Sequence, residues 1–482
     1  MTFFNKKYVR CVIAGIIFFV ATFFSVYKLS NSPPVWYDEG FYEQAAMNIA
    51  QHQIWGIQAA PNVFQSLGTV TAGYPLLLPI ALSFKLFGIG VLQARGVMVI
   101  FILSFLGVVF LFVKKEKGFY LSMGSLALLA TYPTLYGNGK TVLGEVPGLL
   151  YLMVSLLLLN YWVENKSGKY ALAAGIFLGL AMSSKLSFLL TGLPSVILLL
   201  VYLYKIDADR IKNLLLYLFG ILFTLFIWIQ TQFGSNDSIH SFFVTTFRHY
   251  DGPSGSTLLL QNIWRFFTEV TPLYALLTIG VWYCALFIRW RQKNKISEGE
   301  LFASFFTLLN VGVYLLSPGW YRYLFPAQVI ALIFFPASLS SVLSVVFKNK
   351  KLIQGIIIST ILFLSAVQFY QVAFSSFVAT YYKSDRTQKS ADAFSRLPQD
   401  KTYFIYNLPE IVIFLPKGLV YYQYLNSHPI FGIGREYLVE LSKGTPDAVI
   451  MYLESYNQNK SLFTSYPVQQ KITDRYILLL KK

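Results

Sequence analysis

The sequence predicts a polytopic α-helical membrane protein with a small α/β domain at its C-terminal end. Hydrophobic residues make up 55% of the 482 residues and charged residues only 13%, and the mean hydropathy is +0.55. The apolar residues gather in runs of about bilayer length, which a soluble core does not require. These observations exclude an ordinary soluble globular protein.

About eleven apolar runs are long enough to be membrane-spanning helices. They cover residues 9–30, 95–113, 119–137, 146–163, 169–185, 187–204, 211–232, 270–290, 300–316, 322–346 and 352–375. The first run follows Lys6, Lys7 and Arg10, which is the order of a signal peptide. Its full spanning length and the lack of a small-residue cleavage site favour an uncleaved first helix.

The distribution of basic residues predicts the topology. Lys and Arg number 39 against 22 Asp and Glu, a balance that can indicate nucleic-acid binding. Here the cations fall in short clusters between apolar runs, as they do in the cytoplasmic loops of membrane proteins. We therefore predict membrane lipids, and no nucleic acid, as partners.

The segment 73–88 decides the orientation of every later helix. It is apolar but short, and it contains Pro75, Pro79 and Lys85. If the N-terminus is cytoplasmic and this segment lies on the outer surface, the basic clusters at 114–117, 166–169, 205–212, 289–295 and 348–351 are all cytoplasmic. We predict an interfacial helix inside a first exterior loop spanning 31–93. A short tilted span, offset by another miscounted helix, is the alternative.

The chain changes character near residue 383, so we divide it into a transmembrane catalytic domain, 1–382, and an exterior domain, 383–482. Short β-rich runs at 402–406 and 447–452 alternate with a helical stretch at 435–442. This alternation is typical of a small α/β domain. The predicted topology places this domain on the non-cytoplasmic side.

Three acidic residues are candidates for chemistry because the predicted topology brings them to this same exterior face. Asp38 could be a general base that takes a proton from an acceptor hydroxyl, or it could cap the helix expected from Phe41 onward. Glu39 could orient the acceptor or bind a metal. Alternatively, it could be only a charge in the first turn of a helix that the helix dipole stabilises. Glu145 precedes Pro147 and is also a plausible helix-start residue. Two carboxylates meeting there would suit acceptor activation or a divalent cation.

Several cations on this face could hold a lipid phosphate, which must be stabilised as a leaving group. Arg322 and Tyr323 open the tenth predicted span, Arg248 lies in the long loop 233–269, and Lys140 precedes Glu145. Lys185 is a further candidate. Each cation could instead extend to lipid headgroups without any role in catalysis.

Five segments occur in an order found in one known group of membrane enzymes. They are WYDEGFYEQAAMNIA at 36–50, GYPLLLPIALSFKLFG at 73–88 followed by Arg95, GEVPGLL at 144–150, GLAMSSKLSFLL at 179–190, and WYRYLFPAQVIAL at 320–332. The chain resembles the GT-C type glycosyltransferases, in the group of protein O-mannosyltransferases and bacterial lipid A aminoarabinose transferases. The resemblance covers about residues 10–345.

The resemblance implies transfer of a sugar from a polyprenyl-phosphate carrier to a protein, lipid A or another glycolipid or glycan, on the non-cytoplasmic face of a bacterial-type inner or plasma membrane. It implies that Asp38 is the base, Glu39 its acidic neighbour, Glu145 the acid that opens a later helix, and Arg322 the basic residue of an RYxxP-like turn. Many relatives have Lys-Pro-Pro where this chain has Ala-Gly-Tyr-Pro at 72–75. Another cation would have to replace that lysine: Arg248, Lys140 or Arg322.

Two other functions compete with the transferase. A transporter or flippase of polyisoprenoid-linked glycans should show paired half-repeats and charged or broken helices near the bilayer midplane. A non-catalytic membrane scaffold would not need carboxylates and cations to converge on one face. The predicted clustering favours the transferase over both.

Overall fold

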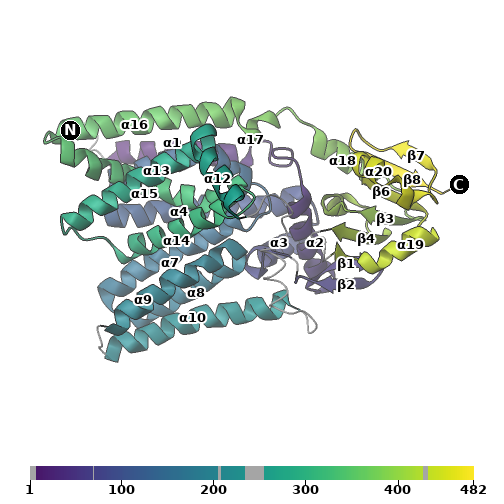
Figure 1. Ribbon diagram of the computed structural model, residues 1–482, viewed down its shortest axis with the longest axis horizontal. Helices are drawn as coiled ribbons and strands as arrows, with labels where there is room; N and C mark the ends of the chain where they lie inside the picture. The colour runs from purple at the N-terminus through teal and green to yellow at the C-terminus, as the bar shows by residue number, and fades with distance from the viewer. Residues whose placement is uncertain (1–6, 69, 205–207, 234–254, 427–431, 482) are drawn as a thin grey trace.

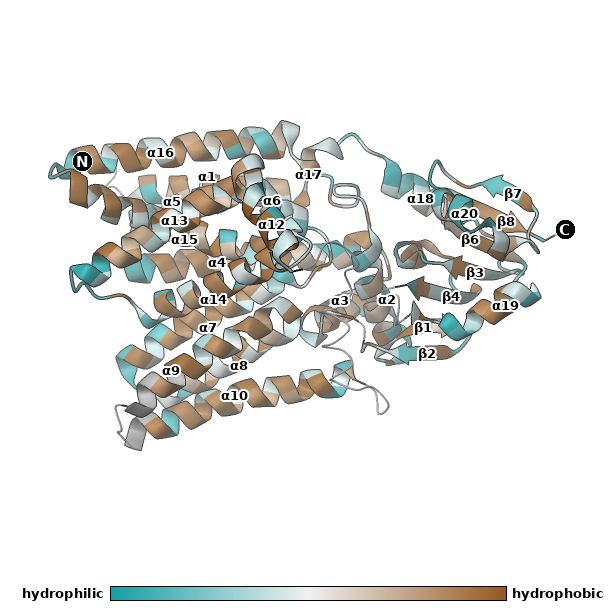
Figure 2. Cartoon of the chain, in the orientation of Figure 1, coloured by the Kyte–Doolittle hydropathy of each residue, from teal (hydrophilic) through white to brown (hydrophobic). Residues whose placement is uncertain are grey.

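A bundle of long helices and a C-terminal sheet domain lie at opposite ends of the molecule (Figure 1). The computed structural model describes residues 7–68, 70–204, 208–233, 255–426 and 432–481. In the bundle, apolar residues dominate the long helices, and polar residues are more frequent toward their ends and in the C-terminal domain (Figure 2). This distribution suits a bilayer, because apolar residues can face hydrocarbon and a helix satisfies its own backbone hydrogen bonds there.

Each predicted span overlaps at least one helix. The bundle comprises α1 (Lys7–Val26), α4 (Val91–Lys117), α5 (Phe119–Ala130), α7 (Glu145–Asn165), α8 (Gly168–Ser184), η2 (Leu186–Thr191) with α9 (Gly192–Tyr204), α10 (Ala208–Gln232), α13 (Val270–Arg291), α14 (Glu298–Leu315), α15 (Tyr321–Val346) and α16 (Lys350–Tyr370). Within the described residues, 7 helices are long and apolar enough to cross a membrane. The other predicted spans are α5, α8, η2 with α9, and α14.

The predicted span 119–137 is not one continuous helix. Helix α5 ends at Ala130, and a separate helix α6 (Pro133–Gly139) begins with a proline in its first turn. Proline lacks the backbone N–H that the helix interior needs and pushes the preceding residue out of helical conformation. Tyr132 is accordingly extended, with φ −74° and ψ 111°. The prediction of one helix was therefore wrong at this break.

The first loop forms a layer between the bundle and the C-terminal domain. It contains α2 (Tyr37–His52), the antiparallel hairpin of β1 (Gly56–Ala60) and β2 (Val63–Ser66), and α3 (Tyr74–Phe87). Helix α3 is the helix predicted at 73–88, and it packs against α2. Both helices lie at the end of the bundle that faces the C-terminal sheet (Figure 1).

The predicted α/β domain is present at the C-terminal end. Its sheet has the strand order β5-β4-β3-β6-β8-β7, with β3 (Thr402–Tyr406) parallel to β4 (Val420–Asn426) and to β6 (Ala448–Tyr452). The remaining strands are β5 (Gly432–Ile433), β7 (Val468–Lys471) and β8 (Tyr476–Leu480). Side chains alternate along β3, so Tyr403 and Ile405 enter one apolar cluster and Phe404 another. The sheet is therefore covered on both faces.

Short helices follow α16 and lie between the strands. They are η3 (Gln371–Ser375), α17 (Phe377–Thr380), α18 (Arg386–Phe394), η4 (Pro409–Phe414), η5 (Arg435–Tyr437), α19 (Leu438–Lys443), α20 (Leu453–Gln458) and η6 (Lys460–Phe463). The first two, η3 and α17, pack against the bundle. The predicted strands at 402–406 and 447–452 and the predicted helix at 435–442 correspond to β3, β6 and η5 with α19.

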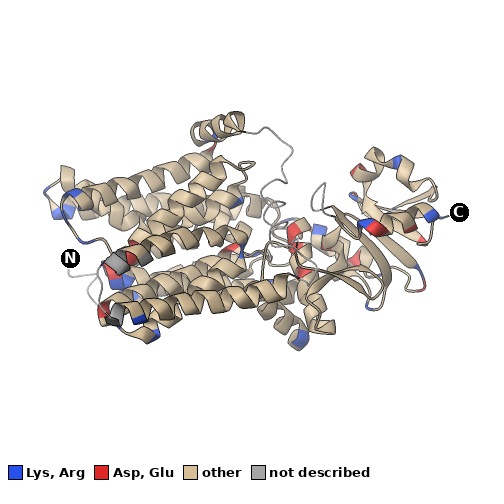
Figure 3. Cartoon of the chain, turned by 60° about the horizontal axis from the view of Figure 1, so that its bottom comes forward, with Lys and Arg blue, Asp and Glu red and all other residues tan. Residues whose placement is uncertain are grey.

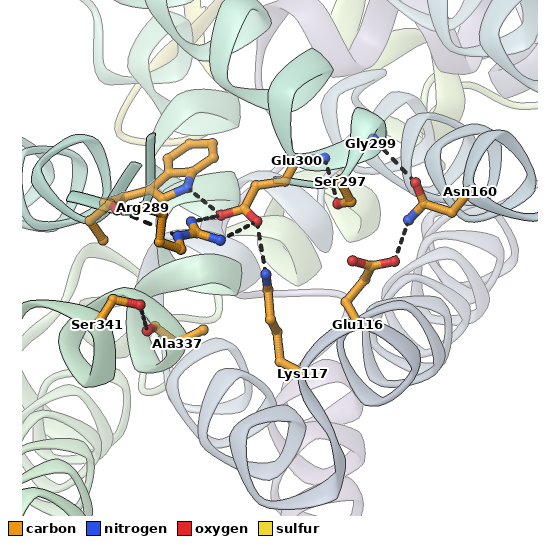
Figure 4. A network of polar contacts seen from close by, with 11 residues as sticks. Glu116, Lys117, Asn160, Arg289, Ser297, Gly299, Glu300, Ala337 and Ser341 are labelled. Atoms are coloured by element: carbon orange, nitrogen blue, oxygen red, sulfur yellow. Dashed lines mark hydrogen bonds and ion pairs between the residues drawn. The ribbon is translucent and has the colours of Figure 1, made fainter. Parts of the chain in front are cut away.

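Charged residues gather at the ends of the bundle and are sparse along its length (Figure 3). At the end far from the C-terminal domain, Glu300 of α14 is 1% exposed and binds three partners (Figure 4). Both terminal nitrogens of Arg289 reach its carboxylate, Lys117 Nζ lies 3.0 Å from Oε2, and Trp282 Nε1 donates to Oε1 at 3.2 Å. Arg289 and Lys117 both come from clusters predicted to be cytoplasmic, so the structure joins two of those clusters at one end.

Candidate active site

Helix α2 carries the first candidate residues and presents a different environment to each of its faces. Residues four apart lie on the same side of an α-helix. Asp38 and Tyr42 form one such pair and contact Arg322 and Lys185, respectively. Glu39 contacts Arg95 on a second side, and Gln44 contacts the C-terminal domain on a third. The rotation of α2 therefore decides which acid faces the site.

Asp38 forms an ion pair with Arg322, from the first turn of α15. The pair joins Arg322 Nη1 to Asp38 Oδ2, and the side chains are 21% and 27% exposed, respectively. Among the described residues, Asp38 is the one hydrogen-bond acceptor of Arg322, and Oδ1 of Asp38 accepts no hydrogen bond. The partial exposure and the spare atoms on both sides leave this pair able to bind a ligand. Trp36, not Asp38, is the N-cap of α2, so the helix-cap alternative does not describe Asp38.

Aromatic rings surround the guanidinium of Arg322. Its Cζ lies 4.6 Å from the ring centre of Trp320, 5.4 Å from that of Tyr323 and 5.8 Å from that of Trp36. Ring faces attract cations, and Trp and Tyr are typical of the membrane–water border. These rings hold the guanidinium beside Asp38.

A second acid–base pair lies beside the first. Glu145, the first residue of α7, is 3% exposed, and its Oε1 is 3.8 Å from Nζ of Lys185 at the end of α8. Lys185 Nζ also donates to Tyr42 Oη at 2.7 Å and to Thr71 Oγ1 at 3.0 Å, and burial raises the pKa of Tyr42. Oε2 of Glu145 is buried without a hydrogen-bond partner in the described structure. The second pair thus also has an acceptor atom available.

The two pairs act on each other electrostatically. The charge on Lys185 interacts with Glu145, Asp38 and Arg322, and that on Arg322 interacts with Asp38 and Glu145. We call these four residues the site cluster: Asp38, Glu145, Lys185 and Arg322. It contains two acids and two bases, supplied by α2, α7, α15 and the residue that follows α8. Such a cluster can accept a proton on a carboxylate and hold a phosphate on the cations.

Glu39 lies behind the site cluster in a fully buried ion pair. Its two carboxylate oxygens accept from Arg95 Nε at 2.8 Å and from Arg95 Nη2 at 2.7 Å, and Val142 N donates to Oε1 at 3.1 Å. Arg95 Nη1 also donates to the carbonyl oxygens of Leu29 and Pro33. Removing one member of such a pair leaves a buried charge and costs about 3–5 kcal/mol. The geometry therefore gives Glu39 a role in fixing α2.

The remaining candidates lie away from the site cluster or outside the described residues. Lys140 is fully buried, its Nζ donates to the carbonyl oxygen of Tyr27 at 2.7 Å, and burial together with the charge of Arg95 lowers its pKa to about 7. Tyr323 contributes its ring to the surroundings of Arg322. Arg248 falls outside the described residues.

The described part of the chain holds no group of three or more His, Cys, Asp and Glu side chains that could bind a metal ion. At the site cluster, a divalent cation would have to share Asp38 and Glu145 with Arg322 and Lys185, which already contact them. The fit for a cation is therefore limited to two shared carboxylates.

Tyr42 and Thr71 are the site residues that the sequence analysis missed. Tyr42 could have been found, because it lies four residues after Asp38 in a stretch expected to be helical. Thr71 gave no local signal, because it lies in a loop and reaches Lys185 only through the tertiary fold.

Comparisons with known proteins identify the fold. Residues 76–230 match the model of a family described as dolichyl-phosphate-mannose-protein mannosyltransferase. Two crystal structures of ArnT from Cupriavidus metallidurans are similar over 98% of this chain and 97% of that chain. The apo state has a TM-score of 0.61 at 14% identity, and the form bound to undecaprenyl phosphate has 0.62 at 13%. A comparison with curated protein sequences gave no match.

The apo oligosaccharyltransferase from Archaeoglobus fulgidus is also similar, with a TM-score of 0.60 and 11% identity, over 97% of this chain and 74% of that chain. At such low identity these likenesses establish a common architecture. The GT-C type fold that the sequence resemblance implied is thereby confirmed.

Proposed function

We propose that this membrane protein is a glycosyltransferase that moves a sugar from a polyprenyl-phosphate carrier to a protein or lipid acceptor on the non-cytoplasmic face. The observation that carries the proposal is the site cluster, in which a half-buried Asp38–Arg322 pair lies among aromatic rings beside Glu145 and Lys185. The fold shared with an ArnT that was crystallised with undecaprenyl phosphate supports the same carrier class.

Asp38 is the general base in the proposed reaction. The acceptor oxygen attacks the anomeric carbon of the sugar while Oδ1 of Asp38 takes the acceptor proton. The bond between that carbon and the carrier phosphate oxygen breaks, and its electron pair leaves with the polyprenyl phosphate. A single displacement of this kind inverts the configuration at the anomeric carbon.

Arg322 and Lys185 stabilise the phosphate as charge develops on it. Arg322 has donors left after pairing with Asp38, and Lys185 is held by Tyr42 and Thr71. Lys185 reaches the segment just before residues 72–75, where many relatives have Lys-Pro-Pro. We therefore assign to Lys185 the place of the missing lysine, and to the buried Lys140 a structural contact with Tyr27.

The arrangement favours a transferase over a transporter. In the described residues, the buried ion pairs of the bundle lie at its two ends, one set around Asp38 and Glu39 and the other around Glu300. A transporter needs its charged residues near the bilayer midplane. Chemistry at one membrane face accounts better for the cluster.

The first experiment identifies the substrates. Cells with and without the protein are compared by mass spectrometry of exterior glycans and lipid-linked sugars. We expect one polyprenyl-phosphate sugar to accumulate and one glycan modification to disappear when the protein is absent. No change in either pool would oppose the proposal.

The second experiment tests Asp38 with the donor so identified. Asp38→Asn keeps the size of the side chain but removes its basicity, so turnover should fall at least about a hundredfold while donor binding persists. The matched control is Asp400→Asn, at an exposed position of the C-terminal domain, which should leave turnover unchanged. Near-normal transfer by purified Asp38→Asn protein would remove Asp38 as the base.

A further inference from the structure

Helix α12 (Ser256–Thr268) divides its surface into three sectors. Leu260, Ile263, Trp264 and Phe267 form an exposed apolar stripe, with exposed fractions of 65%, 39%, 66% and 63%. Leu258, Asn262 and Phe266 are buried on the opposite side. Between these sectors runs an exposed polar edge of Thr257, Gln261 and Thr268. A helix in contact with protein, hydrocarbon and water at once has this arrangement.

The position of α12 in the chain supports that interpretation. Glu269 is extended, with φ −118° and ψ 133°, and the spanning helix α13 starts at the next residue. The stripe continues onto exposed apolar residues of α13, including Val270 and Leu277, which are 75% and 58% exposed. In Figure 1, α12 runs across the direction of the bundle helices. The stripe is therefore continuous with the lipid-facing surface of a membrane span.

The buried side of α12 holds the turn that leads into Arg322. Asn262 Nδ2 donates to the carbonyl oxygens of Tyr314, Leu315 and Ser317, at 3.2, 3.0 and 2.8 Å. Arg265 Nη1 donates to the carbonyl oxygen of Gly319 at 2.6 Å. These bonds engage carbonyl groups at the end of α14 and in the turn that follows it.

Gly319 makes this close approach feasible. Its φ is +72°, and an added Cβ would lie 2.0 Å from Arg265 Nη1 and 2.3 Å from Asn262 Oδ1. Only glycine adopts that conformation without strain and also leaves room for both side chains. The turn and α12 are thus fitted to each other three residues before Arg322.

We propose that α12 is an interfacial helix whose apolar stripe lies in the outer leaflet, and that Asn262 and Arg265 are positioning residues that hold Arg322 at a fixed depth relative to the lipid. The occupant of the stripe is the bilayer itself. Holding the turn at this depth would set Arg322 at the level of the donor phosphate. This last step rests on the proposed function, whereas the lipid contact does not.

Spin labels test the lipid contact without any assay of activity. In protein lacking Cys11 and Cys284, labels are attached through Trp264→Cys or Phe267→Cys on the stripe, and through Gln261→Cys on the polar edge. In vesicles of phosphatidylethanolamine and phosphatidylglycerol, the stripe labels should relax more with oxygen than with a water-soluble nickel chelate, and the Gln261 label should show the reverse. Stripe labels open to the nickel chelate, or protected from both reagents by a second protein surface, would overturn the proposal.

A matched pair of variants tests the positioning role. Asn262→Asp keeps the shape but replaces the donor amide with a charge that repels the three carbonyl groups, whereas Gln261→Glu makes the same chemical change on the exposed edge. Asn262→Asp should raise the KM for the polyprenyl-phosphate sugar about tenfold, with kcat much less affected, and should speed amide hydrogen exchange at 317–323. Gln261→Glu should do neither.

These readouts separate the two proposals. If the wild-type protein transfers no sugar but exchange at 317–323 is still faster in Asn262→Asp, the role of α12 is retained and the proposed function is removed. Equal exchange in both variants, or an equal loss of kcat in both, would remove the positioning role even if transfer is confirmed.

Discussion

Arg322 combines three interactions that a lysine could not reproduce together. Its guanidinium pairs with Asp38 through one nitrogen, lies 4.6 Å from the ring centre of Trp320, and has further donors in the same plane. A planar guanidinium can bind a phosphate through two nitrogens and stack on an aromatic ring, whereas an ammonium is a compact charge. The side chain is therefore suited to hold a phosphate against aromatic residues at a membrane border.

The Arg322 series tests this assignment. Arg322→Ala should raise the Kd for the polyprenyl-phosphate sugar at least about tenfold and slow transfer, and Arg322→Lys should recover only part of both. Arg396→Ala, at an exposed position of the C-terminal domain, is the control. Donor binding by titration and transfer by product formation are the two measurements. If Lys restored full binding, Arg322 would only contact headgroups; if all forms were equal, Lys185 and Arg248 would remain as candidates.

Glu410 should make the stability of the protein depend on pH. It is 2% exposed, and its Oε1 accepts from the hydroxyls of Tyr452 and Tyr476. Burial raises its pKa from 4.5 to about 7. Between these pH values the folded protein keeps a proton that the unfolded chain has lost, so the free energy of unfolding falls as the pH rises, by at most about 3 kcal/mol.

The comparison variant for this effect is Glu410→Gln, which cannot titrate. Thermal unfolding midpoints measured from pH 4.5 to 7.5 should fall more steeply for the wild type than for Glu410→Gln. Parallel curves would mean that Glu410 does not hold the extra proton.

At the scale of elements, α2 is fixed from two sides. Arg95 of α4 binds Glu39, while β4 binds Gln44 through reciprocal amide hydrogen bonds with Gln423, at 3.3 and 3.1 Å. Tyr37 Oη also donates to Asn407 Oδ1 at 2.7 Å. These contacts fix the rotation of α2, and that rotation directs Asp38 toward Arg322.

Gly40 allows this docking, and its replacement should disturb the site. An added Cβ would lie 2.3 Å from the backbone nitrogen of Glu410, so Gly40→Ala should displace α2, destabilise the protein by about 1–3 kcal/mol and lower transfer. The control is Gly96→Ala on α4, where nothing lies within 4 Å of the new Cβ. That variant should be neutral or gain up to about 1 kcal/mol from helix propensity. Unfolding midpoints and turnover of both variants decide the matter, and a fully active, stable Gly40→Ala protein would contradict the docking role.

The elements could be predicted from sequence to different degrees. Hydropathy located the bundle helices because bilayer thickness sets their length, and the alternating runs located β3 and β6. The break before Pro133 was missed because apolarity outweighed the proline, and the hairpin of β1 and β2 carried too weak a pattern. In the site, Asp38, Glu145 and Arg322 could be grouped from topology. The burial of Glu39 and the contact of Lys185 with Thr71 depend on how distant helices pack, which no local pattern encodes.

At the scale of the whole molecule, two polar clusters mark the two ends of the bundle. The Glu39–Arg95 pair, adjacent in the chain to Asp38 of the site cluster, lies at the start of α4, and Lys117, the last residue of α4, joins Glu300 and Arg289 at the other end. Helix α4 therefore extends from the proposed catalytic face to the opposite face. Both clusters are consistent with a single orientation of the bundle across the bilayer.

The topology can be tested directly. The positive-inside distribution predicts that a reporter fused after Lys117 will lie in the cytoplasm and that a reporter fused after Lys383 will lie outside. Alkaline phosphatase, which is active only outside the cytoplasm, should thus be active after Lys383 and inactive after Lys117, and a cytoplasm-dependent fluorescent reporter should give the reverse pattern. Because Arg289 and Lys117 bind the same carboxylate, a fusion after Lys293 must agree with the fusion after Lys117. An exterior Lys117 would mean that the bundle has the opposite orientation, with the Glu300 cluster, rather than the site cluster, on the non-cytoplasmic face.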